Sequence, residues 1–377
     1  MVNIAFTGGG TGGHIYPGLA VATVLKKLML EIKAQSRDTG FDFRLIWIGS
    51  SAGMDRSIVE EAGIEFFGVP SGKLRRYFSL RTAVDFFKVI GGYFAAKKII
   101  KKQKVKILFS KGGFVSVPPC AAASSLGIPV FTHESDFSPG LATKINSRFI
   151  KKNGRIFTAY EETVKFFPKN LHDRVTVCGN PVRDVFYCAD PAKGRSFLNV
   201  KDDERILLVL GGSQGAKEIN ELIRSSLSAL TEIYTVVHQT GPALEWDIPA
   251  AEKYKPYPYI KEEMPHVMAA AEIVMGRSGA GVWEWAVLGK PMILIPLMGS
   301  GTRGDQVENA RFFKQAGAAQ VLTAPEPAEL MLAVNSLAKD EIKRNEMAKA
   351  SAKIGEKNAA MVIAKSILEG ISGFLGN

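Results

Sequence analysis

The sequence has 377 residues, of which 46% are hydrophobic and 23% charged, a composition typical of a globular protein. A chain of this length is longer than a domain with a single hydrophobic core usually is, so we expect two domains. The three cysteines form no Cys-x-x-Cys pair and the five histidines are scattered, which argues against a disulfide framework and a bound metal. With no apolar run of roughly 18 residues and no basic leader, we expect neither a membrane span nor a signal peptide.

The net charge of +11 is concentrated in one segment. Residues 71–111 contain twelve Lys or Arg residues and a single acid, Asp85. Basic residues beside exposed aromatic ones suit an anionic membrane surface, where each cation adds about 1 kcal/mol. The residues expected at that surface are Leu74, Arg75, Arg76, Tyr77, Phe78 and Leu80. The alternatives are a core-facing helix over 82–102 with a solvated basic face, and a nucleic-acid site, which no accompanying motif supports.

The first half of the chain alternates short apolar runs with helical segments, which predicts a parallel sheet with helices on both faces. The predicted strands are residues 2–6, 44–48, 66–69, 106–109, 129–131, 155–158 and 175–177. The predicted helices are residues 16–30, 54–62, 116–125 and 139–146. Residues 179–183 break the alternation and are expected to link the two domains.

The second half repeats the scheme. The predicted strands are residues 205–210, 234–239, 272–275 and 292–296, and the predicted helices are 218–230, 281–288 and 307–315, followed by a helical tail. We therefore predict an α/β chain of two Rossmann-like, doubly wound domains facing a central cleft. The first domain covers residues 1–180 and the second 181–355, and a C-terminal helix over 356–377 packs back on the first domain.

Each half opens with a strand that runs into a glycine cluster, at residues 8–13 and again at 211–215. Glycine lets the backbone approach a ligand closely, and the following helix directs its free N–H groups at that ligand. Both turns are therefore predicted phosphate sites. The first turn also fits the dinucleotide pattern, but strand 44–48 has no acid at its end to hold a ribose, which argues against NAD.

Four further motifs follow predicted strands, where open α/β sheets bind ligands. They are Ser-Lys-Gly-Gly-Phe-Val-Ser at 110–116, His-Glu-Ser-Asp at 133–136, Arg-Ser-Gly-Ala leading to Glu284, and Gly-Thr-Arg-Gly-Asp-Gln-Val-Glu-Asn-Ala at 301–310. In order and spacing, the whole set resembles the MurG family, the N-acetylglucosaminyltransferases that complete the lipid-linked disaccharide precursor of the bacterial cell wall. The resemblance covers nearly the whole chain. It implies the GT-B arrangement of two domains and an inverting transfer without a metal or other cofactor.

The resemblance implies that UDP-GlcNAc binds mainly to the C-terminal domain. Arg183 would face the nucleotide phosphates, Glu284 the ribose hydroxyls, and the backbone of Ile260 the uracil. The implied donor-binding residues are Thr11, Gly12, Gly13, Arg183, Ser213, Gln214, Ile260, Glu284, Asp305, Gln306 and Asn309. Two of them have a structural alternative, Glu284 as an acid satisfying the helix dipole and Asn309 as an amide bonded to its own loop.

The resemblance places the acceptor in the N-terminal domain. The residues implied to bind its diphosphate are Gly9, Gly10, Gly112 and Gly113. A base must take the proton from the MurNAc 4-hydroxyl, and His14 is the first candidate because the ordinary pKa of histidine, about 6.5, suits this task. His14 as a mere cap of its turn is the alternative, and Glu134 and Asp136 are rival bases.

The sequence departs from the family pattern in three places. Ser135 and Asp136 replace two amide residues, so one predicted substrate contact becomes an anion. Phe114 stands where many members carry tyrosine, which removes a hydroxyl. The segment 277–284 is one residue short, which leaves phosphate contacts there to the backbone.

The implied function is transfer of GlcNAc from UDP-GlcNAc to MurNAc-pentapeptide-diphospho-undecaprenol, from lipid I to lipid II, in peptidoglycan synthesis. The implied location is the cytoplasmic face of the plasma (inner) membrane. The expected partners are UDP-GlcNAc, the undecaprenyl-diphosphate-linked acceptor and an anionic membrane surface, without nucleic acid. One alternative is a UDP-GlcNAc 2-epimerase of the same fold, which has no use for the aromatic and basic loop. The other is a basic nucleic-acid-binding or scaffold protein, which leaves the paired glycine turns unexplained.

Overall fold

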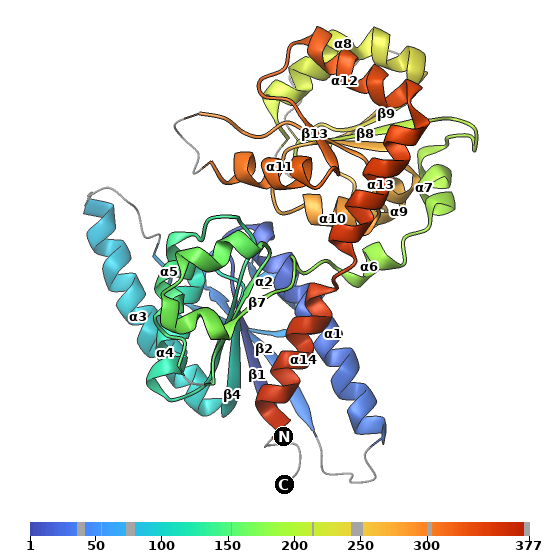
Figure 1. Cartoon of the computed structure of the whole chain (residues 1–377). Coiled ribbons are helices and arrows are strands. Elements are labelled where there is room, and N and C mark those ends of the chain that lie inside the picture. Colours follow the sequence, from blue (N-terminus) through green and yellow to red (C-terminus); the bar gives the residue numbers. More distant parts are fainter. Residues whose placement is uncertain are drawn as a thin grey trace. The chain divides into compact units, whose positions relative to one another are not determined.

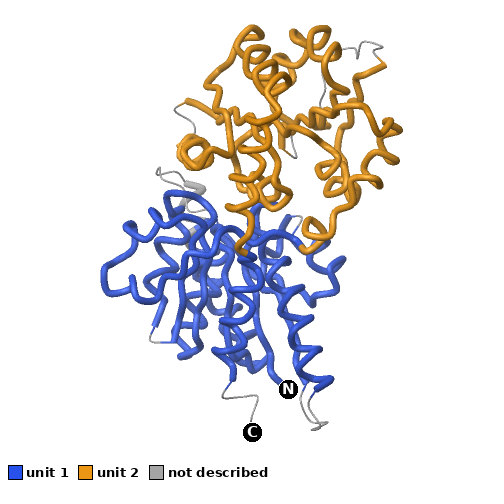
Figure 2. The backbone as a smooth tube through the Cα atoms, turned by 45° about the vertical axis from the view of Figure 1, so that its right-hand side comes forward, with its two compact units in different colours: residues 1–183, 358–377 blue, residues 184–357 orange. Residues whose placement is uncertain are grey.

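The computed structural model describes residues 1–35, 42–53, 55–72, 80–151, 153–212, 215–242, 252–299 and 304–372, with the backbone alone at 80–84 and 86. The chain forms two compact units (Figure 2). Unit 1 consists of residues 1–183 and 358–377, and unit 2 of residues 184–357. The functional roles assigned to the two domains from the sequence stay predictions.

Unit 1 is built on a seven-stranded sheet in the order β3-β2-β1-β4-β5-β6-β7 (Figure 1). Its strands are β1 (Val2–Thr7), β2 (Phe43–Ser50), β3 (Glu65–Val69), β4 (Val105–Ser110), β5 (Val130–Glu134), β6 (Arg155–Thr158) and β7 (Val175–Val177). All strand pairs are parallel, and every residue of β1 is buried, as expected for a strand covered on both faces. The strand order reverses between β1 and β4, so the carboxyl ends of these neighbours form a topological switch point.

The helices of unit 1 lie on both faces of this sheet (Figure 1). They are α1 (Gly12–Gln35), α2 (Asp55–Glu61), α3 (Leu80–Lys102), α4 (Val117–Ser125), α5 (Leu141–Ser147) and α14 (Ala359–Ile371), with short 3₁₀ turns at Phe114–Ser116, Glu161–Phe166 and Lys169–Arg174. The C-terminal helix α14 packs against α1 and β4. Its residues Ile363, Ile367 and Ile371 are fully buried in the same core cluster as β1. Helix α14 therefore belongs to the same hydrophobic core as the N-terminal strand β1.

Unit 2 has a six-stranded parallel sheet in the order β10-β9-β8-β11-β12-β13. Its strands are β8 (Ile206–Leu210), β9 (Thr235–Gln239), β10 (Tyr254–Tyr257), β11 (Ile273–Gly276), β12 (Met292–Leu294) and β13 (Ala319–Val321). Its helices are α6 (Asp184–Tyr187), α7 (Pro191–Leu198), α8 (Lys217–Ile233), α9 (Met264–Ala270), α10 (Val282–Val287), α11 (Asp305–Gln315), α12 (Pro327–Lys339) and α13 (Glu341–Gly355). Sequence patterns did not predict β10 and β13. Both are short edge strands, and an edge position is where a sheet tolerates a proline such as Pro256.

The prediction of two α/β, doubly wound Rossmann-like domains is confirmed. Helix α8 shows how the sequence specifies the packing, because Ile219, Ile223, Leu227 and Leu230 recur at helical spacing and all are buried on the sheet. Among the described helices, none is long and apolar enough to cross a membrane.

Candidate functional site

Two glycine turns meet backbone to backbone at the switch point of unit 1. The turn of residues 8–13 follows β1 and the turn at Gly112–Gly113 follows β4. A Cβ atom built on Gly113 would lie 2.7 Å from the carbonyl oxygen of Gly9 and 3.1 Å from Cδ2 of His14. Only glycine permits this approach, and the φ of Gly113, 77°, also favours glycine. The structure therefore brings together the predicted acceptor glycines and the first candidate base.

His14 lies in the first turn of α1, and its backbone N–H donates to the carbonyl of Thr11 at 3.1 Å. Its half-buried imidazole rests against the Gly112–Gly113 backbone, where a Cβ on Gly112 would come within 3.8 Å of Nδ1. The ring therefore sits beside the turns and at the carboxyl edge of the sheet. This is the place where a base could meet a ligand held by the glycine turns.

Asp55 lies beneath the first glycine turn and was missed by sequence reasoning. Its carboxylate is only 1% exposed and accepts hydrogen bonds from the backbone N–H of Gly10 at 3.1 Å and of Ser50 at 3.4 Å. It also occupies the space into which a side chain on Gly9 would project. One N–H group of the predicted diphosphate turn is therefore directed inward at a carboxylate. The signal in the sequence was the acid at the start of α2, which alone gives no hint of this contact.

The loop after β5 carries the rival bases. Glu134 is buried and accepts three backbone hydrogen bonds, from Ser135 at 2.9 Å and Asp136 at 3.0 Å on Oε1 and from Gly140 at 3.1 Å on Oε2. Burial raises the pKa of Glu134 and the neighbouring Asp136 adds to this rise, while Lys111 opposes it. Glu134 therefore organises its own loop. Asp136, the other rival base, is half-buried.

His133 supports the same loop from within the sheet. Its Nε2 bonds to the carbonyl of Gly179 at 2.9 Å, and the side chain is fully buried. Burial lowers the pKa of His133 well below its ordinary value, and Lys111 lowers it further, so the ring stays neutral. It serves as a hydrogen-bonding core residue.

In unit 2, the second glycine turn is built like the first. It follows β8 and leads into α8, and a Cβ on Gly215, whose φ is 77°, would collide with the carbonyl of Thr240 at the end of β9. Beside the turn, Arg277 forms an ion pair with Glu218, the acid in the first turn of α8. The pair neutralises an acid that would otherwise weaken anion binding at this helix N-terminus.

Ile260 and the glycine turn are connected by Gln239. The Gln239 side chain accepts the backbone N–H of Ile260 at 3.0 Å and donates to the carbonyl of Gly212 at 3.4 Å. Gln239 lies at the end of β9 and is buried, so its amide is held between the two predicted parts of the nucleotide site. This bridging residue was also missed from the sequence, because nothing marks it within its strand.

The predicted sugar-binding residues gather at the carboxyl ends of β11 and β12. Asn309 is 1% exposed and donates from Nδ2 to the carbonyl of Ser278 at 3.1 Å. Gln306 accepts the backbone N–H of Leu297 at 2.9 Å, and its own carbonyl accepts the hydroxyl of Ser278 at 2.6 Å. Asn309 thus stabilises the neighbouring loop, the structural alternative that its pattern left open.

Asp305 and Glu284 both lie in first turns of helices, of α11 and α10 respectively, and both are half-buried. These two carboxylates are therefore accessible in part. They remain suited to contacts with sugar hydroxyls.

The chain was compared with known proteins. Residues 4–154 match the model of the glycosyltransferase family 28 N-terminal domain, and residues 206–365 match that of the glycosyltransferase family 28 C-terminal domain. The UDP-N-acetylglucosamine–N-acetylmuramyl-(pentapeptide) pyrophosphoryl-undecaprenol N-acetylglucosamine transferase of Treponema denticola is 47% identical, covering 97% of this chain and 96% of the relative. The crystal structure of MurG from Acinetobacter baumannii superposes with a TM-score of 0.73 at 25% identity, covering 98% of this chain and 100% of that one. The chain belongs to the MurG family.

Membership of the MurG family confirms both the resemblance noted from the sequence and the GT-B assignment. A UDP-GlcNAc 2-epimerase from Neisseria meningitidis bound to UDP-GlcNAc shares the fold with a TM-score of 0.67, but only 14% of its sequence. This likeness supports the fold alone. The relatives therefore favour the transferase over the epimerase alternative.

Arg183, which the MurG resemblance assigns to the nucleotide phosphates, is the last residue of unit 1. Its guanidinium lies 5.2 Å from the centre of the Tyr16 ring, which in turn packs against Gly12. Arg183 therefore adds a cation beside the first turn of α1.

Several predicted residues fall outside the described part of the chain. They are Ser213 and Gln214 of the second glycine turn and Leu74, Arg75, Arg76, Tyr77 and Phe78 of the basic loop, while Leu80 is the first residue of α3. Among the residues that the structure describes, no cluster of His, Cys, Asp or Glu could hold a metal ion.

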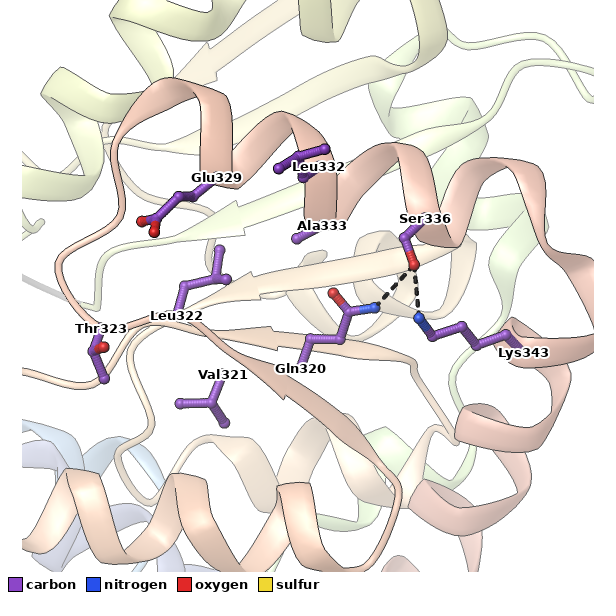
Figure 3. Close-up of a pocket in the computed structure, with 9 residues that line it drawn as sticks. All are labelled: Gln320, Val321, Leu322, Thr323, Glu329, Leu332, Ala333, Ser336 and Lys343. Carbon is purple, nitrogen blue, oxygen red and sulfur yellow. Dashed lines mark hydrogen bonds between the residues drawn. The ribbon is translucent and has the colours of Figure 1, made fainter.

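An open pocket of about 500 Å³ lies between β13, α12 and α13 of unit 2. Figure 3 shows Gln320 and Lys343 pointing toward Ser336, with hydrogen bonds of 3.5 and 2.6 Å to its hydroxyl. None of the predicted site residues lines this pocket. It is separate from the site formed at the glycine turns.

Proposed function

We propose that the protein transfers GlcNAc from UDP-GlcNAc to the 4-hydroxyl of MurNAc in MurNAc-pentapeptide-diphospho-undecaprenol, converting lipid I to lipid II in peptidoglycan synthesis. The observation that carries the proposal is the 47% identity, over nearly the whole chain, with a transferase named for this reaction. The paired glycine turns support it, because both substrates of this transfer contain a diphosphate.

The donor binds to unit 2 in this proposal. The N–H groups of Gly211, Gly212 and Gly215 and the dipole of the 17-residue helix α8 face the UDP diphosphate and stabilise the charge that develops as it leaves. The half-buried carboxylates of Glu284 and Asp305 accept hydrogen bonds from ribose and GlcNAc hydroxyls. With this charge stabilisation from the backbone, the reaction needs no metal ion.

The acceptor binds to unit 1. The two glycine turns at the switch point hold its diphosphate. Arg183, which the resemblance assigns to the nucleotide phosphates of the donor, lies over the Tyr16 ring at the start of α1. His14 takes the proton from the MurNAc 4-hydroxyl while this oxygen attacks the anomeric carbon of GlcNAc, and UDP leaves from the opposite side. A single displacement of this kind inverts the anomeric centre. His14 is preferred to Glu134 as the base, because three backbone N–H groups already occupy the Glu134 carboxylate.

The acceptor's lipid requires contact with a membrane, and helix α3 offers a suitable surface. Phe87 and Phe94 are 71% and 63% exposed, and with Ile90 they form one exposed face that continues into Lys98 and Lys101. Exposed aromatic rings followed by cations fit the interface of an anionic bilayer. The proposed membrane seat therefore includes this face of α3 in addition to the loop residues predicted from the sequence, and it lies at the cytoplasmic face of the plasma membrane.

The decisive experiment is transfer of radiolabelled GlcNAc from UDP-GlcNAc to a short-chain lipid I analogue in the presence of EDTA. We expect transfer by the wild type and a loss of about a hundredfold or more in His14→Ala, as for a missing general base. His172→Ala, in the same unit but in a 3₁₀ turn after β6, is the matched control. Full activity of His14→Ala would move the base to Asp136. Absence of transfer, with ManNAc or UDP released from the donor alone, would favour the epimerase.

The membrane contact is tested separately by flotation with anionic liposomes. The double variant Phe87→Ser/Phe94→Ser should float less than the wild type. Leu332→Ser is the control, because Leu332 is 72% exposed but lies on α12 of unit 2. Equal flotation of the wild type and the double variant would contradict the proposed seat on α3.

A further inference from the structure

A lysine is buried at the switch point of unit 1. Lys111 directly follows β4, is only 2% exposed, and donates from Nζ to the hydroxyl of Ser135 at 2.6 Å. Its backbone N–H donates to the carbonyl of Thr7 at 2.8 Å. A Cβ built on Gly8 would lie 3.2 Å from the Lys111 Cβ, so the lysine packs directly on the first glycine turn. Burying an ammonium group costs free energy unless hydrogen bonds and opposite charges offset the cost. Here the offset comes from the bond to Ser135 and from the nearby carboxylates of Glu134 and Asp136.

Ser135 passes the hydrogen bond on to Asn180. The Ser135 hydroxyl donates to Asn180 Oδ1 at 2.6 Å. A hydroxyl has a single proton, so Lys111 is the donor in the first bond of this chain. Bonds that run in one direction strengthen one another in a low-dielectric interior. The lysine chain, Lys111–Ser135–Asn180, therefore joins the end of β4, the loop after β5 and the segment after β7.

This segment, residues 178–183, is anchored to unit 1 along its whole length. The N–H of Cys178 donates to the carbonyl of Thr158 at 3.0 Å, and the carbonyl of Gly179 is bound by His133. At its other end Arg183 packs on Tyr16 of α1. The segment thus runs from the edge strand β7 to the helix that carries His14, and the lysine chain holds it near its middle.

The charge of Lys111 faces four titratable groups. Burial lowers the pKa of Lys111, while the carboxylates of Glu134 and Asp136 and the thiol of Cys178 raise it. The fourth group, His133, is neutral and has its pKa lowered by Lys111. The lysine thereby offsets the anion that Asp136 introduces where the family pattern has an amide. Both residues that differ from the family pattern, Ser135 and Asp136, therefore interact with Lys111.

We propose that Lys111 is a positioning residue of the acceptor site, which acts through Ser135 and Asn180 to fix the 134–140 loop and the 178–183 segment against the two glycine turns. The consequence is that Asp136 and Arg183 are held in place relative to His14. The inference rests on the proposed function for its kinetic effect, whereas its structural effect is independent of the reaction.

The kinetic test compares Lys111→Met and Ser135→Ala with the wild type, using the full chain and a soluble short-chain lipid I analogue. Both variants should lower kcat/KM for the acceptor by roughly ten- to hundredfold, the usual effect of losing a hydrogen bond to a charged group. The dissociation constant of UDP should change by less than kcat/KM for the acceptor, because most of the predicted donor-binding residues lie in unit 2, which is untouched. Lys106→Met removes the same charge from the other end of β4 and should act like the wild type. Equal losses for acceptor and donor would indicate general destabilisation and overturn the proposal.

A pH profile separates the charge of Lys111 from its bulk. Burial lowers the pKa of Lys111, so the activity ratio of wild type to Lys111→Met should fall as the pH rises toward the ordinary lysine value of about 10.4, because the wild-type lysine loses the proton that methionine never carries. Groups whose pKa does not depend on Lys111 cancel in this ratio. A ratio that does not change with pH would contradict a role for the charge.

Hydrogen exchange tests the structural effect even if no transfer is found. In Lys111→Met and Ser135→Ala, amides of residues 134–140 and 178–183 should exchange at least tenfold faster than in the wild type, while those of β8 and β9 should not change. Faster exchange without any transfer would uphold the lysine chain and reject the proposed function. Unchanged exchange would reject the lysine chain, whatever the activity.

Discussion

The imidazole of His14 lies on the bare backbone of Gly113. A side chain at position 113 would meet Cδ2 of His14 at 3.1 Å and the carbonyl oxygen of Gly9 at 2.7 Å. The φ of 77° adds a conformational cost for any other residue. The missing side chain at position 113 is therefore what allows the candidate base and both glycine turns to share one site.

Gly113→Ala should reduce GlcNAc transfer by about a hundredfold, comparable to loss of the base itself, because the methyl group displaces His14. Gly127→Ala is a matched control. Its φ is 73°, and among the described residues no atom lies within 4 Å of a Cβ built there. Both variants place a side chain at a positive φ, and Gly113→Ala adds contacts with the Gly9 carbonyl and with His14 that Gly127→Ala lacks. Similar activity of the two variants would show that the contact is unimportant.

Asp55→Ala should destabilise the protein by about 2 kcal/mol and lower kcat/KM for the acceptor. The substitution removes the buried carboxylate that accepts the part-buried hydrogen bonds from the N–H groups of Gly10 and Ser50, and a hydrogen bond to a charged group is worth about 1.5–3 kcal/mol. Chemical denaturation and steady-state kinetics measure the two effects. Glu60→Ala on the same helix removes an exposed carboxylate paired with Arg56 and should cost less than about 0.5 kcal/mol. An Asp55→Ala protein with tighter acceptor binding would instead mean that the carboxylate repels the diphosphate.

Much of the fold could be predicted from the sequence, because parallel strands buried on both faces are continuous apolar runs. The run 206–210 and the glycines that follow it are readable without any knowledge of the partner strands. The short edge strand Tyr254–Tyr257 was not readable, since it has a proline and no apolar run. Its place in the sheet depends on pairing with β9 alone.

Site residues could be predicted where the backbone conformation requires a particular residue type. They could not be predicted where a side chain contacts a residue that is distant in the sequence. Gly113 is marked by its neighbours in the sequence. Asp55 and Gly10 are 45 residues apart and meet only after β1 and β2 have paired. The bond from Asn309 Nδ2 to the carbonyl of Ser278 likewise joins residues 31 positions apart, and nothing in the local sequence marks it. A buried polar group is satisfied by whichever partner the tertiary fold supplies, and that partner has no local signature.

Gln239→Leu should weaken UDP binding by about tenfold, equivalent to about 1.4 kcal/mol. The amide of Gln239 is hydrogen-bonded both to Gly212 of the glycine turn and to Ile260, which is predicted to contact the uracil, and leucine can make neither bond. Gln239→Glu should also weaken binding, because a carboxylate oxygen would face the Gly212 carbonyl. Isothermal titration with UDP measures both effects.

Gln315→Glu, at the exposed end of α11, makes the same change of charge in unit 2 and should leave UDP affinity unchanged. If Gln239→Leu bound UDP as tightly as the wild type, UDP binding would not depend on the bridge between Gly212 and Ile260.

The stability of unit 2 should fall in acid because of His238. This side chain is fully buried, bonded through Nδ1 to the Tyr254 hydroxyl at 3.0 Å and through Nε2 to Asn220 Oδ1 at 3.1 Å. Burial lowers the pKa of His238 to about 4, compared with about 6.5 in an unfolded chain. Between these values the unfolded chain binds a proton that the folded chain does not. The free energy of unfolding is therefore highest above about pH 6.5 and decreases as the pH falls toward 4.

The decrease due to His238 should reach about 3 kcal/mol at pH 4, since each unit of pKa difference is worth about 1.4 kcal/mol. Calorimetry of the wild type and His238→Gln between pH 7 and pH 4 measures the decrease. A change of this size shifts Tm by roughly ten degrees, which calorimetry resolves. The variant is less stable at neutral pH because glutamine cannot reproduce both hydrogen bonds, but its stability should fall less with acid. His133 and the carboxyl groups titrate in both proteins, so they cancel in the difference. Parallel pH curves for the two proteins would show that His238 is protonated in the folded state as easily as in the unfolded one.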